Sequence, residues 1–120
     1  MSIDQIKPTE VQAAATLVIV LPSGRQLTLP AEGETVLGRL DATRNVFPGI
    51  DLTSENGLDD GVSRQHARIH RQKTQYFIED LGSTNGTFLN GQRLVPYLPY
   101  LLHDADELEL GGVRIHANVK

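Results

Sequence analysis

The sequence predicts a single all-β domain, a sandwich or barrel built from many short strands. From residue 16 onward, short runs rich in Val, Ile, Leu and Thr recur between turn-forming Gly, Pro, Asn and Asp. No long window sustains the apolar period of an amphipathic helix with caps. The 120 residues are enough for one domain with one hydrophobic core.

The predicted strands follow one another with recognisable turns. A Pro22-Ser23-Gly24 turn places the first two strands at the distance of a hairpin. Residues 40–62 hold few apolar side chains and are long for a loop, and loops of that length are often functional. The strands are expected at residues 17–21, 26–29, 34–39, 50–52, 67–70, 76–79, 87–89, 93–95, 107–110 and 113–116.

The N-terminal segment differs in character from the rest of the chain. Residues 1–15 are polar and then Ala-rich without a convincing period, so they are expected to form a flexible tail before a domain at residues 16–120. The segment lacks the basic start and apolar middle of a signal peptide. The longest apolar stretch, residues 16–21, is too short to cross a bilayer. We therefore expect a cytoplasmic protein without membrane insertion.

The composition excludes several classes of function. The chain has no cysteine, which rules out disulfides, thiolate metal sites and cysteine nucleophiles. The formal charge of −4, with scattered basic residues and acidic ones gathered at residues 51–60, argues against a nucleic-acid partner. Only a local positive pocket is compatible with this charge distribution.

Four polar, turn-forming clusters lie between the predicted strands. Inter-strand loops of a sandwich collect at its two ends, so several clusters are able to converge at one end. Together they supply two guanidiniums, at least two hydroxyls and a carboxamide, with no carboxylate among the motif side chains. These groups suit a phosphate ester attached to a peptide, because Arg matches phosphate oxygens and Asn can hold a peptide backbone. The clusters are residues 38–39, 63–66, 83–87 and 90–91.

The order and spacing of these motifs resemble the signature of the forkhead-associated (FHA) family. Gly38-Arg39, Ser63-Arg64-Gln65-His66 and Asn85-Gly86-Thr87 carry the resemblance, together with the longer run at residues 79–91. The resemblance covers residues 16–115. It implies an eleven-stranded β-sandwich of FHA type that binds phosphothreonine peptides through loops at one end.

The resemblance also implies a role for each motif residue. Arg39 and Ser63 would bind the phosphate, and Arg64 would contact the phosphate or the adjacent ligand backbone. Thr84 would add a hydroxyl contact, and Asn85 would hold the peptide main chain after the phosphothreonine. Gly38, His66 and Gly86 would support the structure of the site. His66 would act as a buttress that orders the binding loop.

Two positions depart from the family pattern or bear on selectivity. The family usually has Gly-Asp before its tenth strand, whereas this chain has Ala105-Asp106, which costs stability if the first position needs positive φ. Gly61, two residues before Ser63, has no side chain to contact the third residue after the phosphothreonine. Asp59 and Asp60 are expected to disfavour an acidic residue there.

The expected function is that of an interaction module and not of an enzyme. Phosphothreonine-bearing proteins are the expected partners, which implies a Ser/Thr kinase upstream. Threonine is expected over serine, because a methyl pocket adds about 0.8 kcal/mol. A phosphate-independent scaffold on the same fold remains the alternative. A small hydrolase using Ser63 and His66 is disfavoured, because no Gly-x-Ser-x-Gly elbow surrounds Ser63.

Other polar residues are assigned no ligand role. Asn90-Gly91 is read as a hairpin turn. His70, His103 and His116 lie without metal-ligand spacing, so neither a metal nor a cofactor is expected.

Thr9, in Lys7-Pro8-Thr9-Glu10-Val11, is a hypothetical phosphosite whose phosphate would bind the domain of the same or another copy.

Overall fold

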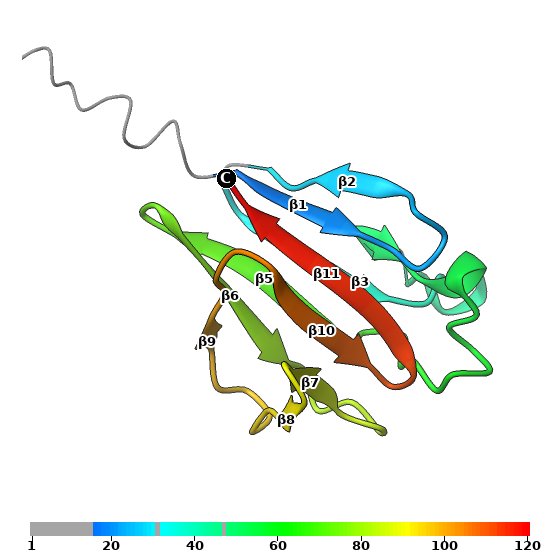
Figure 1. Cartoon of the computed structure of the whole chain (residues 1–120). Helices are drawn as coiled ribbons and strands as arrows, with labels where there is room; N and C mark the ends of the chain where they lie inside the picture. The colour runs from blue at the N-terminus through cyan, green and yellow to red at the C-terminus, as the bar shows by residue number, and fades with distance from the viewer. Residues whose placement is uncertain (1–15, 31, 47) are drawn as a thin grey trace, which may run out of the picture.

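The computed structural model describes residues 16–30, 32–46 and 48–120, and these residues form eleven strands in two sheets (Figure 1). The prediction of an all-β, eleven-stranded sandwich is therefore confirmed. The predicted tail, with Thr9, lies outside the described residues. The strands are β1 (Leu17–Val20), β2 (Gln26–Thr28), β3 (Glu34–Gly38), β4 (Ile50–Asp51), β5 (Ala67–Gln72), β6 (Gln75–Asp80), β7 (Thr87–Leu89), β8 (Gln92–Arg93), β9 (Tyr100–Leu101), β10 (Asp106–Leu110) and β11 (Val113–Val119).

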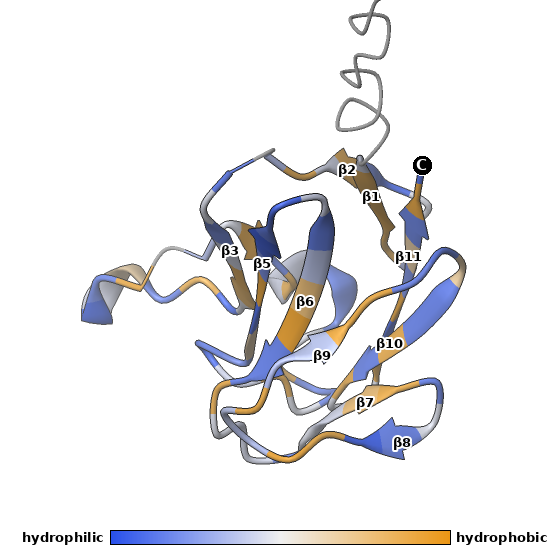
Figure 2. Ribbon diagram, turned by 90° about the vertical axis from the view of Figure 1, so that its left-hand side faces the viewer, coloured by the Kyte–Doolittle hydropathy of each residue, from blue (hydrophilic) through white to orange (hydrophobic). Residues whose placement is uncertain are grey.

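The two sheets form two layers that face each other (Figure 2). The first has the order β2-β1-β11-β10-β7-β8 and the second the order β4-β3-β5-β6-β9. Side chains alternate along each strand, so that β10 buries Leu108 and Leu110 and leaves Glu107 and Glu109 half-buried. The largest fully buried apolar side chains between the layers are Leu17, Ile19, Leu37, Ile50, Leu52, Ile69, Ile78, Leu108, Leu110 and Ile115.

Near residue 95, the structure differs from the strand prediction in two ways: it has one strand that is not predicted, and one predicted strand lies at other residues. The sequence pattern does not predict β9, because Pro96 and Pro99 interrupt the apolar run there and argue against a strand. Tertiary pairing of Tyr100 with Ile78 of β6 nevertheless forms it. The strand expected at residues 93–95 lies at Gln92–Arg93, since the Asn90-Gly91 turn, with φ of 51° and 86°, sets the register between β7 and β8.

The long segment between β3 and β5 is folded against its neighbours. It contains β4, which pairs parallel to β3, and the two 3-10 turns η2 (Ala42–Arg44) and η3 (Thr53–Glu55). The buried Glu55 carboxylate accepts hydrogen bonds from the backbone N–H of Ser23 at 2.9 Å and from its hydroxyl at 2.7 Å. These bonds attach η3 to the β1–β2 turn.

In the part of the chain that the structure describes, the helical segments are short 3-10 turns. No described residue belongs to an α-helix, as the sequence predicts. None of the described helical segments is long and apolar enough to span a membrane.

Ala105, where the sequence resemblance expects glycine, has a left-handed backbone conformation. Its φ is 68°, in the left-handed region where an L-residue with a Cβ is strained. The adjacent Asp106 stabilises the turn by accepting hydrogen bonds from the Asn90 carboxamide at 2.9 Å and the His103 N–H at 2.7 Å. The turn is therefore held by Asp106 despite the strain at Ala105.

Replacing Ala105 by Gly is expected to raise the free energy of unfolding by up to about 1 kcal/mol, because relief of left-handed strain exceeds the entropic cost of glycine. Urea denaturation measures the change. Ala42→Gly, on an exposed turn without positive φ, is the matched control and should lower stability by about 0.5–1 kcal/mol. A loss of stability in Ala105→Gly as large as in this control would contradict the interpretation.

Candidate functional site

The polar clusters identified in the sequence meet at one end of the sandwich. Arg39 directly follows β3, and Ser63 and Arg64 precede β5. Thr84 and Asn85 lie in the loop between β6 and β7, at the same end of the molecule (Figure 1). All five residues line one hollow of about 250 Å³. The structure thus brings the predicted ligand residues together in a polar pocket.

The side chain of Arg39 is oriented by the backbone of the opposite wall. Its Nε donates to the carbonyl of Val62 at 2.5 Å, and its backbone N–H donates to the carbonyl of Arg64 at 3.2 Å. Among the described residues, neither terminal nitrogen of this guanidinium has a hydrogen-bond or ion-pair partner. Both terminal nitrogens are therefore available to an anion in the hollow.

Arg64 is held by a carboxylate that the sequence analysis did not include. Its Nε donates to Asp41 Oδ2 at 2.6 Å, and the Thr43 hydroxyl donates to Asp41 Oδ1 at 2.7 Å. These two hydrogen bonds, the one from Thr43 foremost, lower the pKa of Asp41 below its ordinary value. Asp41 is therefore ionised at neutral pH and holds the Nε edge of Arg64. Only the spatial pairing reveals this residue, since 23 positions separate it from Arg64.

Ser63 connects two walls of the hollow. Its hydroxyl oxygen accepts a hydrogen bond from the backbone N–H of Thr84 at 3.2 Å. Its own backbone N–H donates to Nδ1 of His66 at 3.0 Å. The hydroxyl hydrogen remains free to donate to a ligand, because the Thr84 bond uses only an oxygen lone pair.

His66 lies beneath the site with no exposed surface. An amide N–H can only donate, so Nδ1 must accept from Ser63, and the ring proton must sit on Nε2, which donates to the carbonyl of Gly86 at 2.8 Å. Burial lowers the pKa of His66, which keeps the ring neutral. Both ring nitrogens contact backbone and not the Ser63 hydroxyl, so the two residues do not form a nucleophile–base pair.

Asp80 orders the loop that carries Thr84 and Asn85. It is 1% exposed and accepts hydrogen bonds from the N–H groups of Gly82 and Ser83 at 3.0 and 3.1 Å. It also accepts from the hydroxyls of Ser83 and Thr87 at 2.6 and 2.7 Å. Burial raises the pKa of Asp80, but these hydrogen bonds outweigh it and hold the pKa below its usual value. The sequence analysis quoted Asp80 within a motif but assigned it no role.

Two glycines allow the walls to approach each other. A Cβ on Gly38 would lie 1.8 Å from the carbonyl oxygen of Arg64, so a larger residue would push apart the segments that carry both arginines. Gly86 has φ of 88°, and its carbonyl accepts from His66 and from the N–H of Gly111. Both positions are consistent with the supporting role that the sequence predicts for them.

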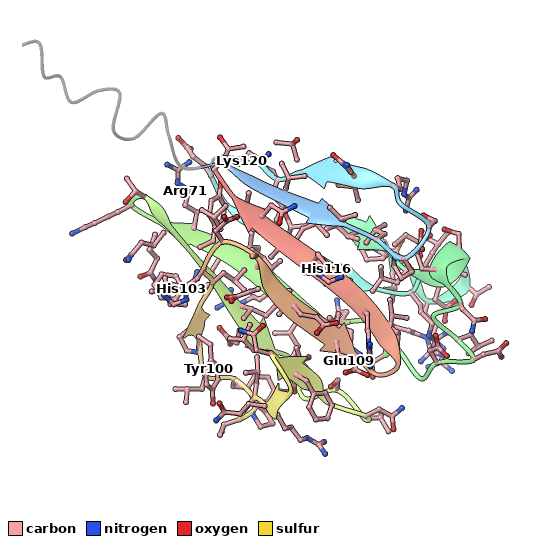
Figure 3. All side chains as sticks on the ribbon, viewed as in Figure 1. Arg71, Tyr100, His103, Glu109, His116 and Lys120 are labelled. Atoms are coloured by element: carbon pink, nitrogen blue, oxygen red, sulfur yellow. The ribbon has the colours of Figure 1, made fainter. Side chains whose placement is uncertain are left out.

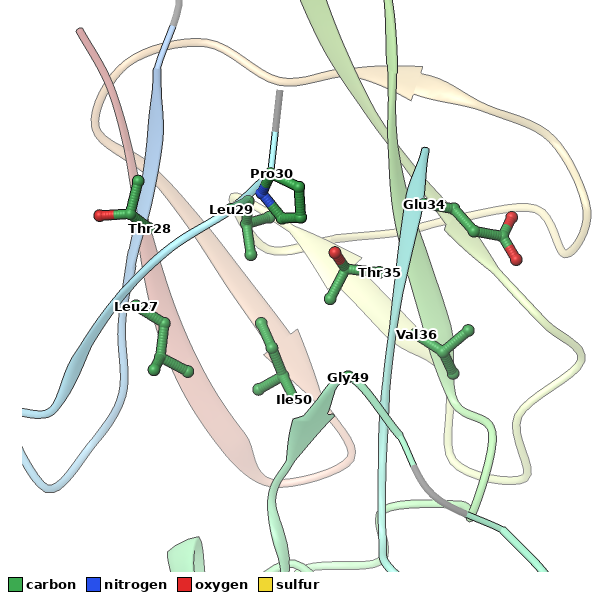
Figure 4. Close-up of a pocket in the computed structure, with 9 residues that line it drawn as sticks. All are labelled: Leu27, Thr28, Leu29, Pro30, Glu34, Thr35, Val36, Gly49 and Ile50. Carbon is green, nitrogen blue, oxygen red and sulfur yellow. The ribbon is translucent and has the colours of Figure 1, made fainter. Parts of the chain in front are cut away.

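A second, larger hollow of about 490 Å³ has a different chemistry (Figure 4). It lies between β2 and the edge formed by β3 and β4, and Leu27, Leu29, Val36 and Ile50 are among its lining residues. Its carboxylate, on Glu34, pairs with Arg68. The larger hollow shares no residue with the polar pocket and presents no cation from its lining, so it is unsuited to a phosphate.

The histidines named in the sequence lie apart from one another. His103 follows β9 and His116 lies on β11 (Figure 3), while His70 stacks on Phe77 with ring centroids 5.6 Å apart. Within residues 16–30, 32–46 and 48–120, no three His, Asp or Glu side chains group as metal ligands would. The described residues therefore give no basis for a metal site.

Comparison with known proteins identifies relatives of this chain. The FHA domain family model matches residues 35–111. Protein FraH of Nostoc is 30% identical over 104 residues, which are 86% of this chain and 35% of FraH. The oxoglutarate dehydrogenase inhibitor of Corynebacterium jeikeium is 34% identical over 97 residues, which are 79% of this chain and 65% of the inhibitor. The chain thus spans less than two thirds of either curated relative.

A solved structure resembles most of this chain. It comes from a structural and functional analysis of phosphothreonine-dependent FHA domain interactions and superimposes with a TM-score of 0.70. The sequences are 29% identical, and the match covers 88% of this chain and 97% of the other.

The buried, neutral His66 should make stability depend on pH. Its pKa in the folded protein lies below the ordinary value of about 6.5, so the unfolded chain binds a proton first as pH falls. The free energy of unfolding should therefore decrease below about pH 6.5, by as much as about 1.4 kcal/mol per pH unit for one proton. Urea titrations between pH 5 and 8 measure the slope. His66→Gln should flatten it, and an unchanged slope in that variant would contradict the assignment.

Proposed function

The chain belongs to the FHA domain family, and we propose that it is a phosphopeptide-binding module that recognises phosphothreonine on partner proteins. One observation carries the proposal: Arg39, Ser63 and Arg64 line a single polar hollow at one end of the sandwich. The similarity to a structure from work on phosphothreonine-dependent FHA interactions supports the same ligand.

The free donors of the hollow suit a dianionic phosphate. The terminal nitrogens of Arg39 and Arg64 would donate to phosphate oxygens, and the Ser63 hydroxyl would add a neutral donor. Each charge-assisted hydrogen bond contributes about 1.5–3 kcal/mol. Two or three such contacts total about 3–9 kcal/mol, and a micromolar complex needs about 8 kcal/mol after the cost of association, so contacts to the peptide beyond the phosphate would supply the remainder. Such an affinity suits a reversible contact that depends on phosphorylation.

The peptide beyond the phosphate would contact the β6–β7 loop. Thr84 and Asn85 lie next to Ser63 in the same hollow, with Thr84 offering a hydroxyl and Asn85 a carboxamide. We assign the carboxamide to the ligand main chain, because it can both donate and accept a hydrogen bond. Gly38, His66 and Gly86 would keep these ligand residues in place without touching the peptide.

Phosphothreonine recognition also bears on the upstream enzyme, the cellular location and the kinds of partner that we propose. A phosphothreonine reader needs a Ser/Thr kinase upstream, and we place both in the cytoplasm. The net charge of −4 disfavours nucleic acid, since the exposed cations outside the hollow are scattered. We propose that the domain performs no reaction, because Ser63 and His66 are not hydrogen-bonded through the Ser63 hydroxyl.

A phosphate-independent scaffold is the second candidate, and one observation favours it. Val95, Tyr97 and Leu98, in the segment between β8 and β9, are 57%, 66% and 49% exposed. Exposed apolar residues that adjoin one another mark some protein interaction sites. A partner bound there would need no phosphate.

Removing a phosphate donor should abolish most of the binding. We expect Arg39→Ala and Ser63→Ala each to weaken binding of a phosphothreonine peptide at least tenfold, measured by fluorescence anisotropy with an oriented peptide library. Arg114→Ala, on the exposed side of β11, is the matched control and should bind like the wild type.

The same titration separates the two candidate functions. An unphosphorylated peptide should not bind, and a phosphoserine peptide should bind about fourfold more weakly, because it lacks one methyl group. Phosphate-independent binding by a folded protein, unaffected by Arg39→Ala, would replace the proposed function with the scaffold.

We also propose Thr9 as a phosphosite whose phosphate binds the hollow of the same or another copy. The motif Lys7-Pro8-Thr9-Glu10-Val11 motivates this proposal. Incubation with Ser/Thr kinases followed by mass spectrometry should detect a phosphate on Thr9, and the phosphorylated protein should bind an added phosphothreonine peptide more weakly. The proposal fails if no kinase phosphorylates Thr9 or if the modification leaves peptide binding unchanged.

A further inference from the structure

Gly61 and Asn85 form an unusually close contact in the wall of the polar hollow. The carboxamide nitrogen of Asn85 donates to the carbonyl of Gly61 at 2.9 Å. A Cβ placed on Gly61 would lie 2.3 Å from this nitrogen, which is closer than real Cβ contacts. The φ of Gly61 is 79°, a conformation that also favours glycine. The left-handed φ thus favours glycine at this position, and a Cβ there would in addition have to displace the carboxamide end of Asn85.

The turn that carries Gly61 is braced and cannot simply withdraw from Asn85. The Gly61 N–H donates to Leu58 at 3.2 Å, and the N–H of the next residue, Val62, donates to Gly57 at 2.8 Å. On the other side, the N–H of Gly112 donates to Asp60 at 2.8 Å. Because the backbone of the turn is held by these bonds, a Cβ on Gly61 would displace the exposed Asn85 carboxamide instead.

The contact also fixes which end of the carboxamide faces which neighbour. The Gly61 carbonyl can only accept, so it selects the amide nitrogen of Asn85 and leaves Oδ1 directed elsewhere. Among the described residues, Oδ1 has no hydrogen-bond donor. Oδ1 therefore remains an acceptor within the site, and a peptide backbone N–H is the donor it suits.

We propose that Gly61 is a positioning residue that holds Asn85 so that Oδ1 accepts a main-chain N–H of the bound peptide. This inference rests on the proposed phosphopeptide function. It defines the ligand class further: the residue whose N–H meets Asn85, after the phosphothreonine, cannot be proline, because proline has no N–H. The sequence analysis connected Gly61 with a missing contact to the ligand, whereas the geometry connects it with Asn85.

A double-mutant cycle tests the coupling between the two residues. Gly61→Ala and Asn85→Ala should each weaken binding of the phosphothreonine peptide about tenfold, the upper range for one lost hydrogen bond. The double variant should bind no more weakly than Asn85→Ala, because the clash disappears with the carboxamide. Gly24→Ala is the matched control, since Gly24 has φ of 91° and nothing within 4 Å of its added Cβ. It should bind like the wild type.

Peptide chemistry provides a second arm. In the wild type, N-methylation of the peptide residue whose N–H meets Asn85, after the phosphothreonine, should weaken binding by the same factor as Asn85→Ala. The same N-methyl group should have little effect on Gly61→Ala. Urea denaturation of every variant separates a loss of binding from a loss of folding.

A third arm does not need the ligand. In two-dimensional ¹⁵N NMR spectra of the free protein, Gly61→Ala should shift the side-chain NH₂ signals of Asn85, and Gly24→Ala should not. Wild-type affinity in a folded Gly61→Ala variant, additive losses in the double variant, or unchanged Asn85 signals would overturn the inference. Absence of phosphate-dependent binding by the wild type would instead overturn the proposed function, and the NMR arm would still decide whether Gly61 positions Asn85.

Discussion

The end of this sandwich that holds the polar hollow depends on one buried imidazole that connects two loops. His66 accepts from the Ser63 N–H and donates to the Gly86 carbonyl, so it sets the distance between the segment before β5 and the loop after β6. Because the ring is fully buried, both contacts must be made, and a missing partner would leave a polar atom unsatisfied. The positions of Ser63 and of the β6–β7 loop in the polar hollow follow from this constraint.

The neighbouring hydrogen bonds extend the same preorganisation toward the ligand. Asp80 orders the β6–β7 loop through four acceptor contacts, and Asp41 and the Val62 carbonyl each hold the Nε of one arginine. Among the described residues, these contacts leave the terminal guanidinium nitrogens of Arg39 and Arg64 without a partner. Under the proposed function, a site held in this way would lose little conformational entropy on binding.

The sequence predicts much of the fold, and it identifies the residues that line the polar hollow, because their signals are local. Strand alternation, the Asn90-Gly91 turn and the contiguous motifs at residues 63–66 and 83–87 can be recognised without knowing the tertiary structure. The missing elements depend on contacts between distant residues. Strand β9 forms through pairing with β6, and the Asp41–Arg64 and Gly61–Asn85 contacts join residues 23 and 24 positions apart. Ala105 lies between these cases, since the family pattern predicts a strained turn but only the structure gives its φ of 68°.

We propose that the hollow near Arg39 and Arg64 binds the phosphate of a phosphothreonine peptide. A crystal structure of the domain with such a peptide tests it most directly. We expect phosphate oxygens within hydrogen-bond distance of both guanidiniums and the Ser63 hydroxyl, with His66 still bonded to Gly86. A peptide bound in the apolar hollow beside β2, or a phosphate that contacts neither arginine, would contradict it.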